Sequence, residues 1–237
     1  ITVTPTVSGC AGTPNTYTIT INPNPTANVP ANSTVCPGVN VAASNYTSNP
    51  AGGTFSWTNS NTAIGLGASG TGNQPAFTSA NATGAAISGT ITVTPALNGC
   101  TGSPNTYTIT VNPTPTVNVP VNITVCPGTN VAASVFTSNP AGGTFAWTNS
   151  NTAIGLGASG TGNQPVFTAT NGTGAAISGT ITVTPTVNSC VGTPNTYTLT
   201  INPNPAAIVP ANSAFCDGES VPASSYSSTP AGATFTW

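Results

Sequence analysis

Apolar and polar residues alternate with a period of two along most of this chain. In residues 106–111 every second residue is Tyr, Ile or Val and the others are Thr, and residues 54–58 and 90–94 follow a similar pattern. This alternation predicts β-strands with one face toward a core and one face toward solvent. No segment spaces its apolar residues as a helix does, and the helix formers Lys, Arg and Met are absent. The pattern therefore predicts an all-β fold.

Turn sequences divide the alternating segments into short strands. Cys36-Pro37-Gly38, residues 49–53 and residues 98–105 are rich in Pro, Gly and Asn, which favour turns. We expect seven strands in the first complete unit, around residues 25–35, 39–47, 54–58, 63–68, 75–80, 87–95 and 105–111. Seven short strands in one unit, with Trp57 in the third, predict an immunoglobulin-like β-sandwich.

The sequence repeats with a period of 90 residues. ITVTP starts at Ile1, Ile91 and Ile181, and 19 of 90 positions differ between residues 22–111 and 112–201. A unit of this length is large enough to close its own core. We interpret residues 1–21 as the C-terminal part of a repeat, 22–111 and 112–201 as complete repeats, and 202–237 as the N-terminal part of a further repeat. The chain is expected to be a piece of a longer array.

A proline-containing segment opens each repeat. Asn22-Pro23-Asn24-Pro25 precedes the first complete repeat, and similar segments start at Asn112 and Asn202. Alternating prolines favour an extended, stiff connector. Because a strand rises about 3.3 Å per residue, each repeat would add roughly 35–45 Å to a rod of tandem sandwiches.

Charged residues are almost absent. The 237 residues include no Lys, Arg or His, and the acids are Asp217 and Glu219, which replace uncharged residues of the preceding repeat. Acid–base catalysis needs side chains that exchange protons, and nucleic-acid binding depends on Lys and Arg. We therefore expect no enzyme activity, no catalytic, cofactor or metal site, and no nucleic-acid partner. The apolar segments are too short for membrane insertion.

Four stretches of the first repeat resemble a known family: TVCPG (34–38), GGTFSW (52–57), IGLGASGTGNQPAF (64–77) and ITVTPALNGCTGSPNTYTITVNPTP (91–115). They are similar to the PKD-like, immunoglobulin-type repeats of giant cell-surface adhesins of the Bacteroidetes, such as the gliding-motility adhesins exported by type IX secretion. The resemblance implies secretion and surface display, and it assigns no binding site. The acidic loops of calcium-binding extracellular repeats are absent here.

Two motifs have both a structural and a ligand-binding interpretation. Trp57, Trp147 and Trp237 recur once per repeat, as a row that stacks on carbohydrate would, but Phe55 shares the face of Trp57, so we expect all three in sandwich cores. Residues 65–70 match the GxGxxG pattern of dinucleotide sites, which requires a helix next. The Thr-Gly-Asn-Gln-Pro that follows cannot start a long helix, so we expect a glycine-rich bend.

Six cysteines recur at fixed positions, early in a repeat (Cys36, Cys126, Cys216) and in its last hairpin (Cys10, Cys100, Cys190). Without His or a CxxC pair, they are interpreted as disulfide candidates in an oxidising compartment. Two pairings are open: Cys36–Cys100 with Cys126–Cys190 within repeats, or Cys36–Cys190 between repeats. Immunoglobulin topology places the two positions at opposite ends of a domain, and a disulfide needs Cα atoms within about 7 Å, which favours the second pairing.

The expected surface consists mainly of Thr, Ser and Asn. Such repeats would suit the passive stalk of a large surface adhesin, or the wall of a self-assembling extracellular filament, because low net charge and edge strands without Lys favour association. Direct binding of a carbohydrate or a surface is a weaker alternative. The expected partners are neighbouring repeats, further copies of the chain or other surface polymers, outside the cell.

Overall fold

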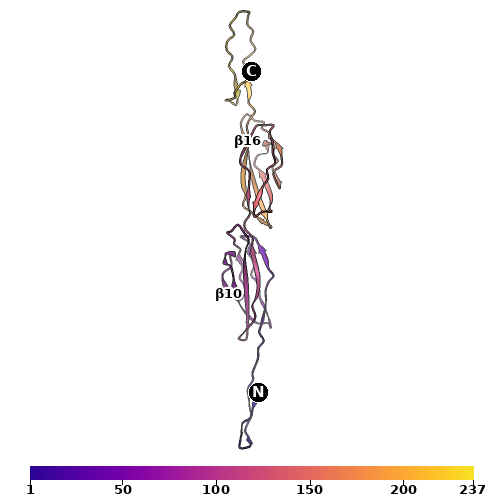
Figure 1. The fold of residues 1–237 in the computed structure, drawn as a ribbon, viewed down its shortest axis with the longest axis vertical. Helices are drawn as coiled ribbons and strands as arrows, with labels where there is room; N and C mark the ends of the chain where they lie inside the picture. Colours follow the sequence, from indigo (N-terminus) through magenta and orange to yellow (C-terminus); the bar gives the residue numbers. More distant parts are fainter. The chain divides into compact units, whose positions relative to one another are not determined.

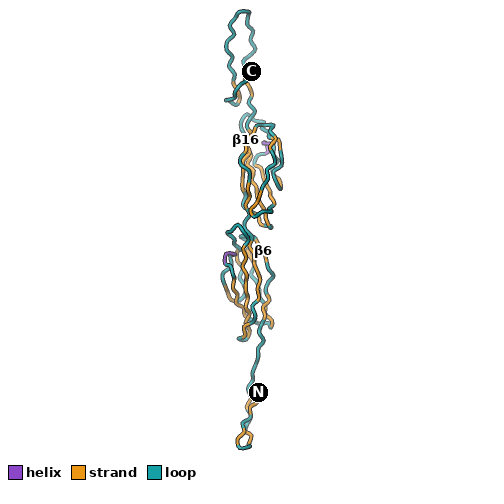
Figure 2. Tube along the Cα trace, viewed as in Figure 1, coloured by secondary structure: helices purple, strands orange, loops and turns teal.

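The computed structural model describes all 237 residues. They form two compact units, Ile1–Asn81 with Ala86–Val111, and Ala82–Ala85 with Asn112–Trp237. The first unit contains the first complete repeat except residues 82–85, and the second unit contains the second complete repeat; Figure 1 marks the two repeats with the labels β10 (Ser69–Thr71) and β16 (Ile123–Val125). Strands and turns make up both repeats, and helix is confined to one 3-10 turn in each (Figure 2). The all-β prediction is confirmed.

The elements of the first complete repeat are β5 (Thr26–Asn28), β6 (Ser33–Val35), β7 (Asn40–Val41), β8 (Thr47–Asn49), β9 (Thr54–Asn59), η1 (Thr62–Ile64), β10 (Ser69–Thr71), β11 (Phe77–Thr78), β12 (Ile87–Leu97), β13 (Cys100–Thr101) and β14 (Asn105–Val111). Those of the second are β15 (Thr116–Asn118), β16 (Ile123–Val125), β17 (Asn130–Val131), β18 (Thr137–Asn139), β19 (Thr144–Asn149), η2 (Thr152–Ile154), β20 (Ser159–Thr161), β21 (Phe167–Thr168), β22 (Ile177–Val187), β23 (Cys190–Val191) and β24 (Asn195–Ile201). The partial repeats contribute β1 (Thr2–Val3), β2 (Thr6–Val7), β3 (Cys10–Ala11), β4 (Asn15–Thr16), β25 (Ala206–Ile208) and β26 (Ser227–Thr229).

Each complete repeat is a two-layered β-sandwich. The main sheet of the first has the order β10-β9-β12-β14-β6, and that of the second has the matching order β20-β19-β22-β24-β16. The central strands pair antiparallel, whereas β6 joins β14 in parallel, as β16 joins β24. In the first repeat the pairs β5–β8 and β7–β11 form the opposing layer.

The alternating pattern explains the core. On β12 and β14, Ile91, Val93, Tyr107, Ile109 and Val111 are buried, while the threonines between them face outward. A second core of equivalent residues lies in residues 117–201. Each complete repeat therefore buries its own apolar face. Neither 3-10 turn has the length or apolarity of a membrane-spanning helix, and the structure has no other helix.

The strand expected at residues 63–68 is wrong. Those residues contain most of the 3-10 turn η1, whose start is capped by Asn61: its side-chain oxygen accepts a hydrogen bond from the Ala63 amide at 3.0 Å. Gly65 ends the turn with φ at 98°, a left-handed conformation that residues with a Cβ rarely adopt. The next strand starts only at Ser69. Asn and Gly at the two ends therefore decide the local structure.

Two other expected strands are each divided between partners. Residues 25–35 form β5, which pairs with β8, and β6, which pairs with β14. Pro30 lies between them, and proline has no N–H with which to continue a ladder. Residues 39–47 similarly contain β7 and the start of β8. The first strand thus contributes to both layers of the sandwich.

Candidate functional site

Trp57 and Trp147 lie in the cores, each 4% exposed. Each indole ring packs against a glycine of the neighbouring strand; a Cβ at Gly70 would lie 2.6 Å from Cε2 of Trp57, so only glycine fits there. These two rings are therefore not available to stack on a carbohydrate. Trp237 differs, at 98% exposed. Residues 202–237 contain no counterparts of β10 and β12, the strands that flank Trp57 in the main sheet, so the core position of Trp237 stays a prediction.

The GxGxxG segments do not form a dinucleotide site. Gly65 ends the turn η1, and Gly70 belongs to strand β10. No helix follows, so there is no helix N-terminus to face a pyrophosphate. The glycine-rich bend expected from the sequence is present, and its glycines serve a left-handed turn and the close approach to Trp57.

The cysteines are in two states. Cys36 and Cys190 are each disulfide-bonded, whereas Cys10, Cys100, Cys126 and Cys216 are free thiols. The pairings Cys36–Cys100 and Cys126–Cys190 are thus wrong, because one member of each is free. Within each repeat these cysteines occupy the positions expected from the sequence: Cys36 follows β6, and Cys100 and Cys190 start the short strands β13 and β23.

The two carboxylates lie on a turn. Asp217 and Glu219 are exposed, and Glu219 Oε2 accepts a hydrogen bond from the Cys216 amide at 2.8 Å while the Glu219 amide donates to the Cys216 carbonyl at 3.1 Å. Glu219 therefore closes a local turn and forms no acid pair in a cleft.

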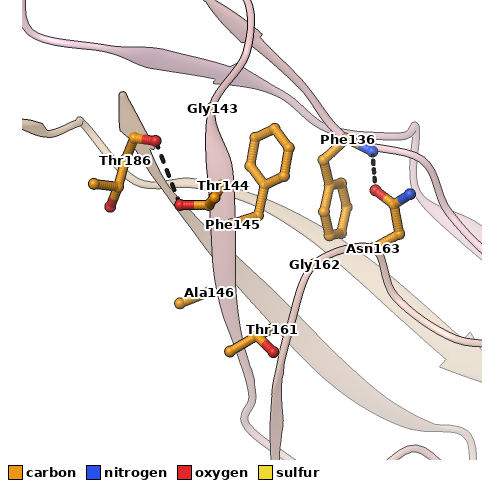
Figure 3. A pocket seen from close by; sticks show the side chains of 9 residues that line it. All are labelled: Phe136, Gly143, Thr144, Phe145, Ala146, Thr161, Gly162, Asn163 and Thr186. Atoms are coloured by element: carbon orange, nitrogen blue, oxygen red, sulfur yellow. Dashed lines mark hydrogen bonds between the residues drawn. The ribbon is translucent and has the colours of Figure 1, made fainter. Parts of the chain in front are cut away.

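The candidate site that sequence reasoning missed is an open groove beside the main sheet of each repeat. In the second repeat it has a volume of about 620 Å³. Figure 3 shows the rings of Phe136 and Phe145 side by side, between β19 and the loop of Gly162 and Asn163. The rings meet edge to face with centroids 5.8 Å apart. The rest of the lining consists of Gly143, Ala146 and the three threonines Thr144, Thr161 and Thr186.

Hydrogen bonds hold the walls of this groove in place. The Phe136 amide donates to Asn163 Oδ1 at 3.0 Å, which ties the segment before β18 to the loop (Figure 3). Across the sheet, Thr144 Oγ1 donates to the Thr186 carbonyl at 3.5 Å. The groove combines an aromatic floor with hydroxyl and amide groups on its rim. It offers apolar contact and neutral hydrogen bonds, and it contains no charged group.

The equivalent groove of the first repeat has a volume of about 670 Å³ and contains Tyr46 where the second has Phe136. The Tyr46 hydroxyl points to the Tyr107 hydroxyl, at 3.0 Å. Burial, and secondly the interaction with Tyr107, raises the pKa of Tyr46 far above its usual range. The phenol therefore stays neutral at ordinary pH and cannot act as a general base.

A buried polar network next to this groove was also missed. Gln74 is fully buried, and its Oε1 accepts hydrogen bonds from the Tyr107 hydroxyl at 2.5 Å and from Ser44 Oγ at 3.4 Å. In the second repeat, Gln164 accepts from Tyr197 at 2.7 Å and from Ser134 at 3.0 Å. In the sequence, the recurrence of glutamine at the same position of both complete repeats was a signal that could have indicated this network. The network links the two layers and has a structural role.

The sequences of both complete repeats match one protein family. The model of the family described as "PKD-like domain" matches residues 33–115 and, separately, residues 123–205. The chain belongs to the PKD-like domain family. Both matched segments contain a complete main sheet, and each starts after the first strand of its sandwich, β5 or β15. Domains of this family are generally non-catalytic structural modules of extracellular type.

No curated protein sequence matches the chain. Similar solved structures include protocadherin gamma B7 extracellular cadherin domains 1–4, with 12% identity, a TM-score of 0.36, and coverage of 84% of this chain and 57% of that one. Mouse cadherin-23 EC22–24 has 13% identity, a TM-score of 0.40, and coverage of 78% and 68%. The tandem Ig repeats of Dlar have 12% identity, a TM-score of 0.28, and coverage of 76% and 98%. The chain thus spans little more than half of the protocadherin structure. The fold assignment rests on the sheet topology and the family.

Proposed function

We propose that these PKD-like repeats form the structural stalk of a large extracellular surface adhesin, of the gliding-type Bacteroidetes kind that the sequence resembles. The main support is that each complete repeat closes its own core from its own 90 residues. A repeat of this kind needs no ligand or cofactor to fold. Each additional tandem copy adds length and supplies its own stabilising core, which suits a spacer.

The composition of the outer faces also supports a spacer. On β9, β12 and β14, the positions between core residues are occupied by Thr and Ser. These side chains form hydrogen bonds with water and carry no charge, so they attract neither ions nor charged polymers. We propose residues 1–21, 22–111, 112–201 and 202–237 as successive units of the array, secreted to the cell surface.

Solution scattering on the full chain tests this function. The stalk predicts a monodisperse monomer with a radius of gyration well above the roughly 18 Å of a compact globule of 237 residues. A radius close to that value, or concentration-dependent growth into polymers, would contradict it.

A filament wall is the second candidate, and the sheet edges favour it. The edge strands β6 and β16 have three residues each and no charged side chain to discourage pairing with another chain. If electron microscopy shows fibres, the double variant Thr34→Lys/Thr124→Lys should dissolve them, because it places a charge on each edge. Fibres that resist these charges would exclude pairing through this edge.

The groove at Phe145 favours a weaker third candidate, the binding of a neutral carbohydrate, because its aromatic floor is partly exposed and its rim is uncharged. Calorimetric titration with neutral oligosaccharides tests it. Binding that is lost in Phe145→Ala would support this function, and no heat of binding to the parent chain would exclude it for the sugars used.

A further inference from the structure

The outward face of each main sheet carries hydroxyl groups at almost every position. On the central strands β9, β12 and β14 of the first repeat, the outward side chains are all Thr or Ser except Ala96. The edge strands continue this face with Ser69 and Thr71 on β10 and Thr34 on β6. Because side chains alternate between the faces of a sheet, the residues between them point into the core. The sheet therefore has one apolar face and one hydroxyl face.

The strand register aligns these hydroxyls in rows across the sheet. Four ladder partners in succession form the central row: Ser69, Thr58, Thr92 and Thr106. In the row beside it, Thr90 is the partner of Thr108. Residues that are ladder partners point to the same face, so the outward side chains of neighbouring strands lie next to one another. Strands and rows together arrange the hydroxyl groups on a grid.

The second repeat has the same grid. Its central row consists of Ser159, Thr148, Thr182 and Thr196. Figure 3 shows how β19 separates the two faces of the sheet: the ring of Phe145 lies on one side of the strand, and Ala146 and the hydrogen-bonded pair Thr144–Thr186 lie on the other. On the central strands of this sheet, Ala146 is the one outward residue without a hydroxyl.

The dimensions of the grid follow from strand geometry. Outward residues on one strand are two positions apart, which is about 6.7 Å, and neighbouring strands are about 4.8 Å apart. The oxygen atoms on a prism face of ice form a rectangular lattice with two closely similar spacings. Because sheet twist rotates each strand relative to the next, the match is best over the central strands β9, β12 and β14. These strands carry the longest rows of threonine.

Threonine is chemically suited to contact ordered water. Its hydroxyl offers one donor and two acceptor sites, so it can take the place of a water molecule in a hydrogen-bonded lattice. Its branched Cβ restricts the side chain to few rotamers, which holds the hydroxyl at a fixed point of the grid. In the central row the hydroxyls of Thr58, Thr92 and Thr106 form no hydrogen bond with other protein groups. These hydroxyls are therefore free to bond to water at the surface.

The rest of the face favours ice over other extended surfaces. It carries no charged side chain, and a charged group would have to give up its hydration at a high cost before it could lie against ice. A crystalline polysaccharide would be bound through exposed aromatic rings that stack on the sugars. The aromatic residues of this sheet, Trp57 and Tyr107, are instead buried on its opposite face. Hydroxyl and methyl groups are what the outward face offers.

We propose that the outward threonine face of each main sheet, centred on Thr92 and on Thr182, binds ice. The hydroxyls take oxygen positions of the ice surface, and the threonine methyl groups lie between them. Because every complete repeat carries its own face, additional repeats in tandem add further contacts with the same crystal. This activity goes beyond the proposed stalk function and does not depend on it.

The growth of ice grains in a thin frozen film tests the proposal. The parent chain should stop this recrystallisation, and it should be taken up into ice grown slowly from its solution. In Thr92→Tyr/Thr182→Tyr a ring projects from the centre of each face and keeps the neighbouring hydroxyls away from the ice. The concentration needed to stop recrystallisation should then rise about tenfold, which corresponds to a loss of about 1.4 kcal/mol of binding free energy.

A matched variant makes the test specific. Thr78→Tyr/Thr168→Tyr places the same ring on exposed threonines of β11 and β21, outside the main sheets. It should stop recrystallisation at the concentration of the parent, within about twofold. Tyrosine is favoured in strands, so both variants should fold, and thermal melts check this. If Thr92→Tyr/Thr182→Tyr does not fold, Thr58→Tyr/Thr148→Tyr disrupts the same rows at exposed positions and should show the same loss.

The proposal is overturned if the parent stops recrystallisation no better than serum albumin at equal mass. It is also overturned if the folded Thr92→Tyr/Thr182→Tyr variant is as effective as the parent, or if the Thr78→Tyr/Thr168→Tyr variant loses as much. A parallel assay measures binding of the parent to crystalline cellulose and chitin. Binding that only the Thr92→Tyr/Thr182→Tyr variant loses, with no effect of the parent on ice, would assign the face to a polysaccharide and exclude ice.

Discussion

Placing a carboxylate at Asn59 should make the stability of this nearly charge-free protein depend on pH. Asn59 is 8% exposed, and its Nδ2 donates to the carbonyls of Asn61 and Leu66, both at 3.0 Å. Its Oδ1 accepts from the Asn61 amide at 3.1 Å. Asn149 makes the same three bonds in the second repeat. The double variant Asn59→Asp/Asn149→Asp replaces each donor nitrogen with an oxygen that faces two carbonyl oxygens.

The expected loss has two parts. At pH 3 the protonated Asp donates one hydrogen bond where Asn donated two, at a cost of about 1 kcal/mol per repeat. Burial against carbonyl oxygens then raises the pKa of the introduced Asp above its unfolded value of about 3.9. The stability gained by binding this proton is fully present below that value and is lost as the pH rises. A shift of two to three pKa units would cost roughly a further 3–4 kcal/mol at pH 7.

Thermal melts of the full chain between pH 3 and 8, followed by circular dichroism, measure the effect. A domain of about 90 residues loses roughly 4–8 °C per kcal/mol, so the midpoint of the variant should fall by roughly 12–30 °C between pH 3 and 7. The parent should change by only a few degrees. Asn24→Asp, at an exposed position, should behave as the parent does. A variant midpoint that stays flat or rises with pH would refute the assignment of Asn59 and Asn149 as buried donors.

Two further predictions use the tyrosines and the cysteines. Because burial raises the pKa of Tyr46 and of Tyr197, folding favours their neutral forms, and the stability present below pH 10 should be lost as the pH rises further. In thermal melts from pH 8 to 11.5, Tyr46→Phe should reduce this loss of stability, and an unchanged loss would contradict the prediction. The between-repeat pairing that immunoglobulin topology favours predicts that chymotryptic mapping without reductant joins the peptides of Cys36 and Cys190, with the other four cysteines open to alkylation. A Cys36–Cys100 peptide would overturn this pairing.

Local pattern determined much of the fold. The alternation of apolar residues with threonine predicted the buried faces of β12 and β14, and the structure confirms that Ile91 and Tyr107 lie inside. The 90-residue period predicted equivalent sandwiches, which the two matching sheet orders confirm. These features were predictable because successive side chains of a strand point to opposite faces of the sheet, so buried and exposed residues alternate with a fixed period of two.

Turns and side-chain hydrogen bonds were not predictable in this way. Alternation suggested a strand at 63–68, yet the Asn61 cap and the left-handed Gly65 form a turn there. Asn59 follows Phe55 and Trp57 on the buried face of β9, a signal that could have marked it as a buried polar residue. Its hydrogen-bond partners, however, belong to the turn that follows, and no periodicity names them.

The sequence by itself determined that this is an all-β chain of repeated, nearly uncharged sandwiches. Only the tertiary structure decided that β6 pairs with β14 in parallel, that Gln74 accepts from Tyr107 within the core, and that Phe145 forms the floor of a groove. The physical reason is that side-chain period is a local property of the backbone. The β6–β14 ladder pairs Ser33 with Ile109, 76 positions later, and the contact between Gln74 and Tyr107 spans 33 positions, so both are selected by the packing of the whole repeat.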